Sequence, residues 1–330
     1  MSQTTTSQLS FSDGMIRDHH ALHSLDGVTA VLDWSAIEGL LSPIYSSRSG
    51  RPSYPLVTLF RSLLLGCWYR LSDVQLEAQL ARDLVFRKFV LLGLNEGTPD
   101  HSTLSRFRQQ LEAHALWEKL LAEVNRQLTA QHIIMQWGQV SIIDASVIEA
   151  HQSGPGKRKD GSATRDPEAG WNVKQNTRGK KTSTYGYSFH SNVDEDGFIL
   201  GYDMTPGNVH DSQRFEELFT GEEAAVYADS AYASRATEKK LAARGIRNHV
   251  QRKGYRNHPI SDTDRERNKE IGVTRSVVER VFGTLKRHYG MGRTRFLGLL
   301  RNTVHCGLLA IAYNVRKGAH FVQQYGVVGA

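Results

Sequence analysis

The strongest constraint on the fold is a change in the spacing of apolar residues near Trp137. Before it, segments such as "PLVTLFRSLLLGCWYRL" and "SDVQLEAQLARDLVFRKFVLLG" repeat apolar residues at helical spacing. After it, "GQVSIIDASVIEAH" (138–151) has the β-branched run of a buried strand. The chain therefore divides into a helical part and a part that contains a sheet.

The helical part is expected over residues 15–135. The stretch before it, residues 1–14, lacks the charged start and apolar core of a secretory signal and is expected to be a loose tail. Ser72 and the residues from Asp100 to Thr103 are candidate helix caps. The helix that follows Asp100 should expose Arg106 and Arg108. Two short helices, the second basic, resemble a helix-turn-helix module, but amphipathic bundle packing gives the same pattern, and both interpretations stay open.

The part from residue 136 to 330 combines strands and helices. Residues 153–182, rich in Gly, Lys and Arg, are expected to form an exposed loop. "TSTYGYSFHSNV" and "FILGYDMTP" predict two strands joined by the turn "DEDG". The elements predicted after them are a helix at 211–219, a strand at "AAVYAD", a helix at 234–244, a strand at "IRNHVQ", and helices at 262–288 and 297–316. This order predicts a mixed α/β sheet domain.

Charge is distributed unevenly along the chain, whose formal net charge is +7. Residues 235–317 carry 20 Lys/Arg and 6 Asp/Glu, an excess of 14 positive charges. Residues 1–234 hold 21 basic and 28 acidic residues, a net of −7. One basic end favours a phosphate-bearing partner, and a solvated basic surface without a partner is the alternative.

Several classes of protein do not fit the sequence. No apolar run reaches the ~20 residues of a membrane span. Cys67 and Cys306 lie far apart without a CxxC pair, so we expect buried thiols in a reducing cytoplasm. "GPGKRKDGSA" lacks the Lys and Ser/Thr that follow the last Gly of a phosphate loop, and no GxSxG elbow of a hydrolase is present.

Two aspartates end or interrupt predicted strands. Asp144 stands inside "SIIDASVI", where a buried carboxylate is costly unless it is paired, hydrogen-bonded or bound to a metal. Asp229 ends "AAVYAD" just before a helix. Taken singly, each has a local explanation as a turn or cap residue. At the carboxyl ends of neighbouring strands, however, the two side chains can converge where open α/β sheets bind ligands.

A third carboxylate, Glu279, is the only acid in the helical stretch "RSVVERVFGTLKRH". Arg275, Glu279 and Lys286 lie within about 40° of one another around a helix. An ion pair of Glu279 with Arg275 explains two of them but not Lys286. Three carboxylates are hard ligands that suit Mg²⁺ or Mn²⁺. Two such ions about 4 Å apart can promote in-line displacement at a phosphodiester.

At these residues the sequence resembles a known family. "SIIDAS", "VYADSAY" and "RSVVERVFGTLKRH" resemble the three catalytic blocks of bacterial DDE insertion-sequence transposases of the insertion-sequence-5 type, which have an RNase H-like fold. "RPSYPLVTLFRSLLLGCWYRLSD" and "PDHSTLSRFRQQL" are similar to the family's N-terminal helical region, and "TPGNVHDSQRFEEL" to the segment between its first two acids. The resemblance covers most of residues 15–315.

The resemblance implies two domains. Residues 15–135 would form a helical domain for DNA binding or oligomerisation, and residues 136–330 an RNase H-like DDE catalytic domain. Asp144, Asp229 and Glu279 would be the catalytic, metal-binding triad for Mg²⁺ or Mn²⁺, with two ions expected. The DNA-binding residues expected from the resemblance and from the basic patches are Arg275, Lys286, Arg287, Arg252, Lys253, Arg293, Arg295, Arg106 and Arg108.

Some positions depart from the family pattern or have simpler explanations. The usual Tyr three residues before the Arg is Gly272 here, so no aromatic ring is expected at that point. Tyr232 matches the pattern and could serve packing or chemistry. "NVHDSQRF", with His210 and Asp211, is most simply a loop that ends in a helix cap, and His190 a strand residue.

The function implied is a DNA transposase that binds the terminal inverted repeats of its element, cleaves the ends and transfers them to target DNA. Such a protein is expected to act as a homodimer or higher homo-oligomer, in the bacterial cytoplasm at the nucleoid and without a membrane partner. Two alternatives stay open. One is a non-catalytic DNA-binding regulator or relic, and the other is an RNase H-like nuclease without strand transfer.

Overall fold

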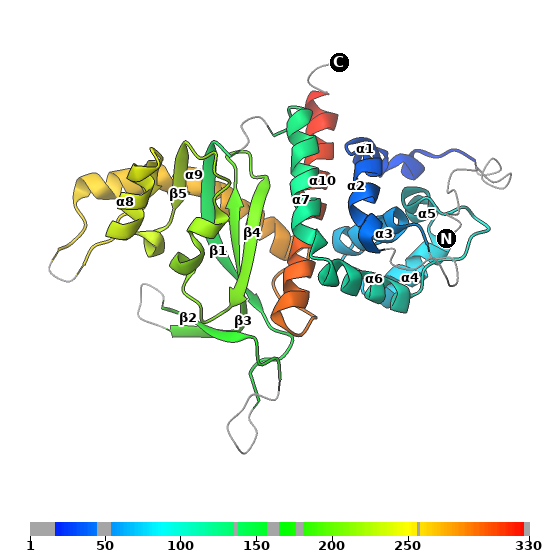
Figure 1. The fold of residues 1–330 in the computed structure, drawn as a ribbon, viewed down its shortest axis with the longest axis horizontal. Coiled ribbons are helices and arrows are strands. Elements are labelled where there is room, and N and C mark those ends of the chain that lie inside the picture. Colours follow the sequence, from blue (N-terminus) through cyan, green and yellow to red (C-terminus); the bar gives the residue numbers. More distant parts are fainter. Residues whose placement is uncertain are drawn as a thin grey trace. The chain divides into compact units, whose positions relative to one another are not determined.

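The structure is a computed structural model. It describes residues 17–44, 54–134, 138–156, 165–175, 181–255 and 258–326 (Figure 1). The predicted loose tail of residues 1–14 lies outside these ranges. The chain divides into two compact units, one of Met1–Ile133 with Gly307–Ala330 and the other of Ile134–Cys306.

The first unit is helical, as the apolar spacing predicts. Its α-helices before residue 134 are α1 (Asp26–Ala30), α2 (Trp34–Leu41), α3 (Leu56–Trp68), α4 (Asp73–Arg82), α5 (Leu84–Val90), α6 (His101–Ala113) and α7 (Leu116–Ala130). Two predicted caps are confirmed. Ser72 and Gln75 form a capping box at the start of α4, and the Asp100 side chain accepts a hydrogen bond from the Thr103 N–H at the start of α6.

Helix α3 is the centre of this unit, and all of its residues except Gly66 are buried. The one basic residue in it, Arg61, is held by the unit itself. Its guanidinium lies 4.0 Å from the centroid of the Trp34 ring and donates to the Phe89 carbonyl over 2.8 Å. These contacts satisfy the charge, so α3 is a core helix and presents no basic face.

Helix α10 (Leu299–Tyr325) runs nine residues past the predicted end at residue 316. From Gly307 onward this helix belongs to the helical unit, whereas residues 136–330 were predicted to form one domain. The Trp68 indole N–H donates to the Ala312 carbonyl over 2.7 Å, and the Asn314 and Asn125 side chains are hydrogen-bonded over 2.7 Å. This half of the helix therefore completes the core around α3 and α7. Of the helices described, none joins the length to the apolar character that a membrane crossing would need.

The second unit is built on one mixed sheet. Its strands are β1 (Val140–Glu149), β2 (Gly170–Gln175), β3 (Lys181–Val193), β4 (Ile199–Pro206), β5 (Ala225–Ala228) and β6 (Arg247–Val250). Along the path β4–β3–β1–β5–β6, β3 is antiparallel to both of its neighbours, and β5 and β6 run parallel to β1. Three antiparallel strands followed by two parallel ones form an RNase H-like sheet, so the predicted fold class is confirmed.

Two predictions of secondary structure in this unit are wrong. The helix expected at 211–219 is a pair of short 3₁₀ turns, Asp211–Arg214 and Glu216–Leu218. The loop expected at 153–182 contains strand β2, which pairs with the start of β3 from Gly170 opposite Gly186 to Gln175 opposite Lys181. Residues 157–164 and 176–180 of that loop lie outside the described residues. The turn "DEDG" is confirmed, with Gly197 at φ 85°.

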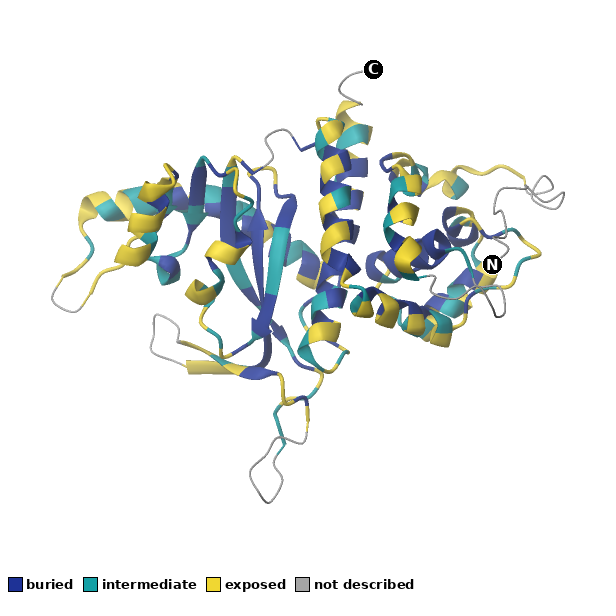
Figure 2. Cartoon of the chain, viewed as in Figure 1, coloured by how far each residue is buried: buried dark blue, intermediate teal, exposed yellow. Residues whose placement is uncertain are grey.

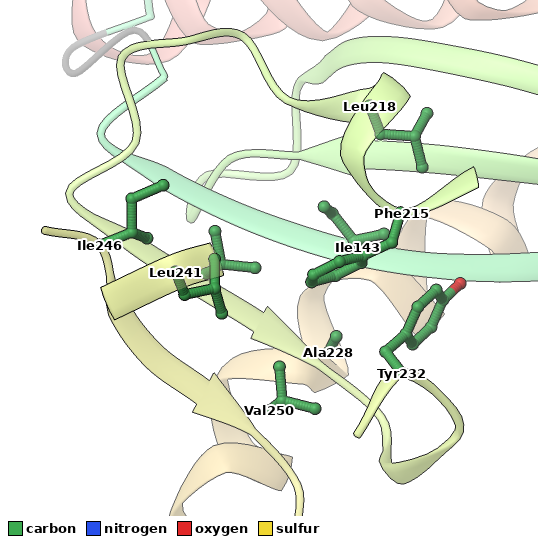
Figure 3. Packing of buried hydrophobic residues seen from close by; sticks show 9 residues of the cluster. Ile143, Phe215, Leu218, Ala228, Tyr232, Leu241, Ile246 and Val250 are labelled. Atoms are coloured by element: carbon green, nitrogen blue, oxygen red, sulfur yellow. The ribbon is translucent and has the colours of Figure 1, made fainter. Parts of the chain in front are cut away.

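Both faces of the sheet are covered. Buried residues follow the strands and the inward sides of the helices (Figure 2). On one face, Ile143 packs with residues from β5, β6, the 3₁₀ turns and α8 (Arg235–Ala243), among them Phe215, Tyr232 and Leu241 (Figure 3). On the other face lies α9 (Asp262–His288), where the Phe282 ring meets the Phe189 ring with centroids 6.1 Å apart. Pairing between β1 and β5 stops at Ile143 and Ala228, so the residues that follow them lie at an edge of the parallel part of the sheet. The two cysteines, Cys67 and Cys306, are buried free thiols, as predicted.

Candidate active site

Two parallel strands bring Asp144 and Asp229 side by side, with Asp144 midway along β1 and Asp229 directly after the end of β5. The register pairs Ile143 of β1 with Ala228 of β5, and each aspartate is the next residue along the chain. Neighbouring parallel strands lie about 4.8 Å apart, so this register places the two backbones side by side. The sequence pattern alone predicted that the two carboxylates could converge here.

The Asp144 side chain is largely buried, with 19% of its surface exposed, and it is held by hydrogen bonds. One carboxylate oxygen, Oδ2, accepts a hydrogen bond from Arg275 Nη2 over 3.0 Å, and Oδ1 accepts one from the Ala145 N–H over 2.8 Å. Burial, with a smaller contribution from the negative charge of Asp229, raises the pKa of Asp144 to about 6. The positive charges of Arg275 and Lys174 and the Ala145 N–H act in the opposite direction. Burial of this carboxylate therefore costs more than its positively charged and hydrogen-bonding neighbours compensate.

Asp229 also has a local role. Its Oδ1 accepts a hydrogen bond from the Ala231 N–H over 2.5 Å and thereby caps a 3₁₀ turn at Ser230–Tyr232. The next helix, α8, is capped by Ser234 instead. The capping role considered from the sequence is thus present, though for a shorter turn, and it coexists with the position beside Asp144.

Arg275 and Glu279 lie one turn apart on α9 but have different surroundings. Arg275 is buried and binds both Asp144 and the Gln251 side chain, the latter over 3.1 Å. Glu279 is exposed. Among the described residues, no group of three His, Cys, Asp or Glu side chains is placed to hold a metal ion. The structure therefore brings two of the three predicted carboxylates together and places the third on the helix that binds the first.

Lys286 and Lys174 add positive charge near this edge. Lys286 is an exposed residue of α9. Partial desolvation lowers the pKa of its ammonium group, and the positive charge of Lys174 also lowers it. Lys174 was not predicted as a site residue, because it lies in β2 within the stretch interpreted as a loop. The alternation of Trp171, Val173 and polar residues in "GWNVKQ" is the signal that could have identified this strand.

The two arginines of α6 that were predicted to bind DNA differ in their exposure to solvent. Arg106 is exposed, as expected. The prediction that Arg108 is exposed is wrong, because it is buried and forms a two-pronged ion pair with Asp73, with both N–O distances 2.9 Å. Arg108 therefore ties α6 to the start of α4. The remaining predicted contacts are exposed on the second unit: Arg252, Lys253, Arg287, Arg293 and Arg295.

Several of these exposed bases already have neighbours within the unit. Arg252 forms an ion pair with Asp264 over 2.7 Å, and Arg293 donates to the His151 carbonyl over 2.9 Å. Lys253 lies 6.0 Å from the centroid of the Tyr255 ring. Such exposed contacts are weak, so they fix these side chains only lightly and leave them able to meet phosphates.

Tyr232 lies beside the acidic pair. Its ring is buried in the cluster of Figure 3, and within the described residues its hydroxyl has no hydrogen-bond partner. Burial raises its pKa, and the negative charges of Asp211, Asp144 and Asp229 raise it further. The hydroxyl therefore stays protonated and can donate a hydrogen bond at the acidic edge.

The histidines singled out in the sequence have structural roles. His190 is fully buried, with Nε2 2.8 Å from the Thr205 hydroxyl and Nδ1 3.7 Å from Asp211. Burial lowers the pKa of His190, which favours the neutral ring. His210 accepts a hydrogen bond from the Ser212 N–H and caps a 3₁₀ turn, as the loop-and-cap interpretation expected.

Gly272 lies one turn before Arg275 on α9. A Cβ atom there would lie 3.9 Å from Gln251 Nε2, the nearest atom outside the helix. The position that carries Tyr in the resembled family thus holds no ring beside the arginine in this chain.

Comparison with solved structures gives weak likenesses. A crystal structure of a pre-cleavage Mos1 transpososome shares 11% identity over 86% of this chain and 83% of that chain, with a TM-score of 0.20. The Mos1 strand transfer complex shares 10% identity over 76% of this chain and 82% of that chain, also with a TM-score of 0.20. These scores are too low to support a conclusion, and the fold rests on the strand order described above.

Comparison with protein families gives a clear result. A family model described as "Transposase domain (DUF772)" matches residues 13–110, which lie in the helical unit. The model of the "Transposase DDE domain" matches residues 138–315, more than half of the chain and all strands of the sheet. The chain therefore belongs to the family of DDE transposases, metal-dependent enzymes that cleave DNA and transfer its strands.

Proposed function

We propose that this transposase is of the insertion-sequence-5 type and uses Asp144, Asp229 and Glu279 as its catalytic carboxylates. It binds the terminal inverted repeats of its own element, cleaves the element ends and joins them to target DNA. The observation that carries the proposal is the position of Asp144 beside Asp229, each directly after the last paired residues of β1 and β5, with the helix that holds Glu279 bound to Asp144 through Arg275.

The donor atoms at this edge suit a hard divalent cation. Carboxylate oxygens are the ligands that Mg²⁺ and Mn²⁺ prefer, and Asp144, Asp229 and Glu279 would hold the ions, two being expected. The raised pKa of Asp144 supports this assignment, because a largely buried carboxylate next to Asp229 favours a nearby positive charge. When bound, such ions activate the attacking oxygen and stabilise the leaving oxygen of a phosphodiester displacement.

The chain's own residues orient the site. Arg275 donates to one oxygen of Asp144 and fixes the rotamer of that carboxylate, while the Ala145 N–H holds the other oxygen. Tyr232 offers a protonated hydroxyl at the same edge. Lys286 stands further along α9, where its ammonium group can meet a DNA phosphate.

DNA is the partner, in keeping with the family. We infer that the exposed bases of the second unit contact it, namely Lys286, Arg287, Arg252, Lys253, Arg293 and Arg295. We infer further that the helical domain over residues 15–135 contributes DNA contacts such as Arg106 and mediates assembly into a homodimer or higher oligomer. Such a protein would reside at the bacterial nucleoid.

The test is a cleavage assay on DNA that carries the element's inverted repeats. With Mg²⁺ the wild-type protein should nick the ends and join them to target DNA. Asp144→Asn should lose cleavage and joining while it still binds the DNA, because it removes one anionic ligand of the proposed metal centre. Asp196→Asn, in the exposed turn between β3 and β4, is the matched control and should behave as the wild type.

The outcomes separate the alternatives. Cleavage without joining would identify a nuclease of this fold. Binding without any metal-dependent cleavage would identify a regulator or relic. Equal cleavage by wild type and Asp144→Asn would remove Asp144 from the mechanism. Inverted repeats that flank the reading frame, with short direct duplications outside them, would supply independent support.

A further inference from the structure

We propose that a two-stranded arm at the edge of the sheet, formed by residues 170–175 and 181–186, grips a DNA strand by stacking Trp171 on an unpaired base. This inference rests on the proposed function, since it assigns a DNA contact beside the proposed active site. The arm lies within the stretch that was predicted to be a loop, and it adds a DNA-holding element that the sequence did not indicate.

The arm projects from the carboxyl end of β1, five residues past Asp144 along that strand. Strand β3 pairs with β1 as far as Glu149 opposite Gly186, and with β2 from Gly186 onward to Lys181. The arm is therefore the part of β3 that continues past the carboxyl end of β1, with β2 beside it. In Figure 1, β2 lies across the end of the sheet towards which β1 runs.

The base of the arm is fixed by close backbone contacts. A Cβ atom at Gly186 would lie 1.9 Å from the Ile148 carbonyl oxygen, so only glycine fits there. The Gly207 N–H donates to the Gly186 carbonyl over 2.9 Å, and the Asn172 side chain donates to the Gly207 carbonyl over 3.0 Å. The arm thus leaves the sheet in a defined direction.

One face of the arm presents apolar side chains to solvent. Trp171 is 44% exposed and Val173 is 58% exposed, and both lie on the same face because residues two apart on a strand point the same way. Trp171 is paired across the strands with Tyr185, whose buried ring lies beside it on the same face with centroids 5.2 Å apart, and the Tyr185 hydroxyl donates to the Asp166 carbonyl over 2.7 Å. A large ring that is braced at its side by a fixed neighbour and is partly exposed to solvent can stack on another flat ring.

The positive charge of the arm favours DNA as its binding partner. Residues 170–175 and 181–186 contain two lysines, Lys174 and Lys181, and no Asp/Glu. Lys174 and Lys181 are both exposed. Lys174 also lies close enough to the site for its charge to lower the pKa of both Asp144 and Lys286. Lysines beside an exposed aromatic ring are the usual combination for unpaired nucleic acid, because bases stack on the ring and lysines meet the phosphates.

The experiment measures binding without cleavage, in full-length protein that carries Asp144→Asn. Two DNA probes are compared, one a duplex of the element end and the other the same duplex with unpaired terminal nucleotides that include 2-aminopurine. Adding Trp171→Ala should weaken binding of the unpaired probe by about 5- to 150-fold and restore the 2-aminopurine fluorescence that stacking quenches, while duplex binding changes little. Trp171→Phe should recover most of the affinity.

Two further variants complete the test. Lys174→Ala should reduce the slope of log K against log salt by about 0.7 on the unpaired probe, as expected for one lost phosphate contact. Tyr325→Ala removes a comparably exposed aromatic residue from the helical unit and should have no effect on either probe. Thermal melting of each variant verifies that it is folded.

Three results would overturn the arm's role. These are unchanged affinity and fluorescence in folded Trp171→Ala, equal losses on both probes, or a change in oligomeric state without a change in DNA affinity. The last would assign this face to a second copy of the chain. Failure of the proposed function is separate, because it would appear as Asp144-independent cleavage or none in the wild type, whatever the arm binds.

Discussion

Replacing Asp144 with Asn should make the metal-free protein more stable at neutral pH, although it removes a proposed catalytic residue. Burial and the neighbouring Asp229 raise the pKa of Asp144 from 3.8 to about 6 in the folded state. Each pKa unit corresponds to about 1.4 kcal/mol, so this difference makes the ionised carboxylate cost about 3 kcal/mol of folding free energy. Asn keeps the shape and a hydrogen-bond acceptor for Arg275 without the charge.

The sign of the pH dependence follows from the raised pKa. The folded state binds the Asp144 proton more tightly than the unfolded chain does. The stability that Asp144 contributes is therefore complete below its ordinary pKa of 3.8 and is lost as the pH rises through about 6. The gain from Asp144→Asn should be near zero at pH 4 and reach about 3 kcal/mol above pH 7.

Urea unfolding in EDTA at pH values from 4 to 8 measures this difference. Asp196→Asn, in the exposed turn, is the control and should track the wild type throughout. The reasoning is refuted if Asp144→Asn is no more stable than wild type at pH 8, or if its advantage is as large at pH 4 as at pH 8. Mg²⁺ should raise the melting temperature of the wild type more than that of Asp144→Asn, since a ligand of the folded state stabilises it by mass action.

Three further substitutions test the structure. Arg108→Ala should destabilise the helical unit by about 3–5 kcal/mol in urea unfolding, because it breaks a largely buried two-pronged ion pair, whereas Arg106→Ala should change stability by less than about 0.5 kcal/mol. Gly186→Ala should abolish soluble expression or lower the melting temperature by many degrees, because the added Cβ meets a carbonyl oxygen at 1.9 Å. Gly272→Ala should stabilise α9 by about 0.5–1 kcal/mol, since alanine favours the helix and no atom outside the helix comes closer than 3.9 Å.

The elements that could be predicted from the sequence are those with a strong local signal. The apolar alternation and the turn before Gly197 identified β3 and β4, and Ser72 and Asp100 marked the starts of α4 and α6. The proximity of Asp144 to Asp229 could also be predicted from the sequence, because residues that follow neighbouring parallel strands meet at one edge of a sheet.

The features that were missed depend on contacts between distant residues. Strand β2 lies in a Gly- and Lys-rich stretch, and its pairing with β3 comes from tertiary contacts that composition does not reveal. Arg108 appeared exposed because a helical pattern shows which residues are polar but not which of them find a partner. Its ion pair with Asp73 bridges 35 residues along the chain. The two 3₁₀ turns at 211–218 replace a predicted helix because Phe215 and Leu218 pack against the sheet.

Glu279 can share a metal ion with Asp144 and Asp229 only if its side chain extends far enough from α9 to come near them. The Arg275–Asp144 hydrogen bond fixes this part of α9 against β1, and buried Val278 and Val281 hold the helix there. Glu279 follows Arg275 by four residues, about 6 Å along the helix axis and about 40° around it. Its side chain is exposed, so no packing holds it away from the acids. We therefore expect that the proposed three-carboxylate site would form by a change of rotamer in the Glu279 side chain, with α9 in place.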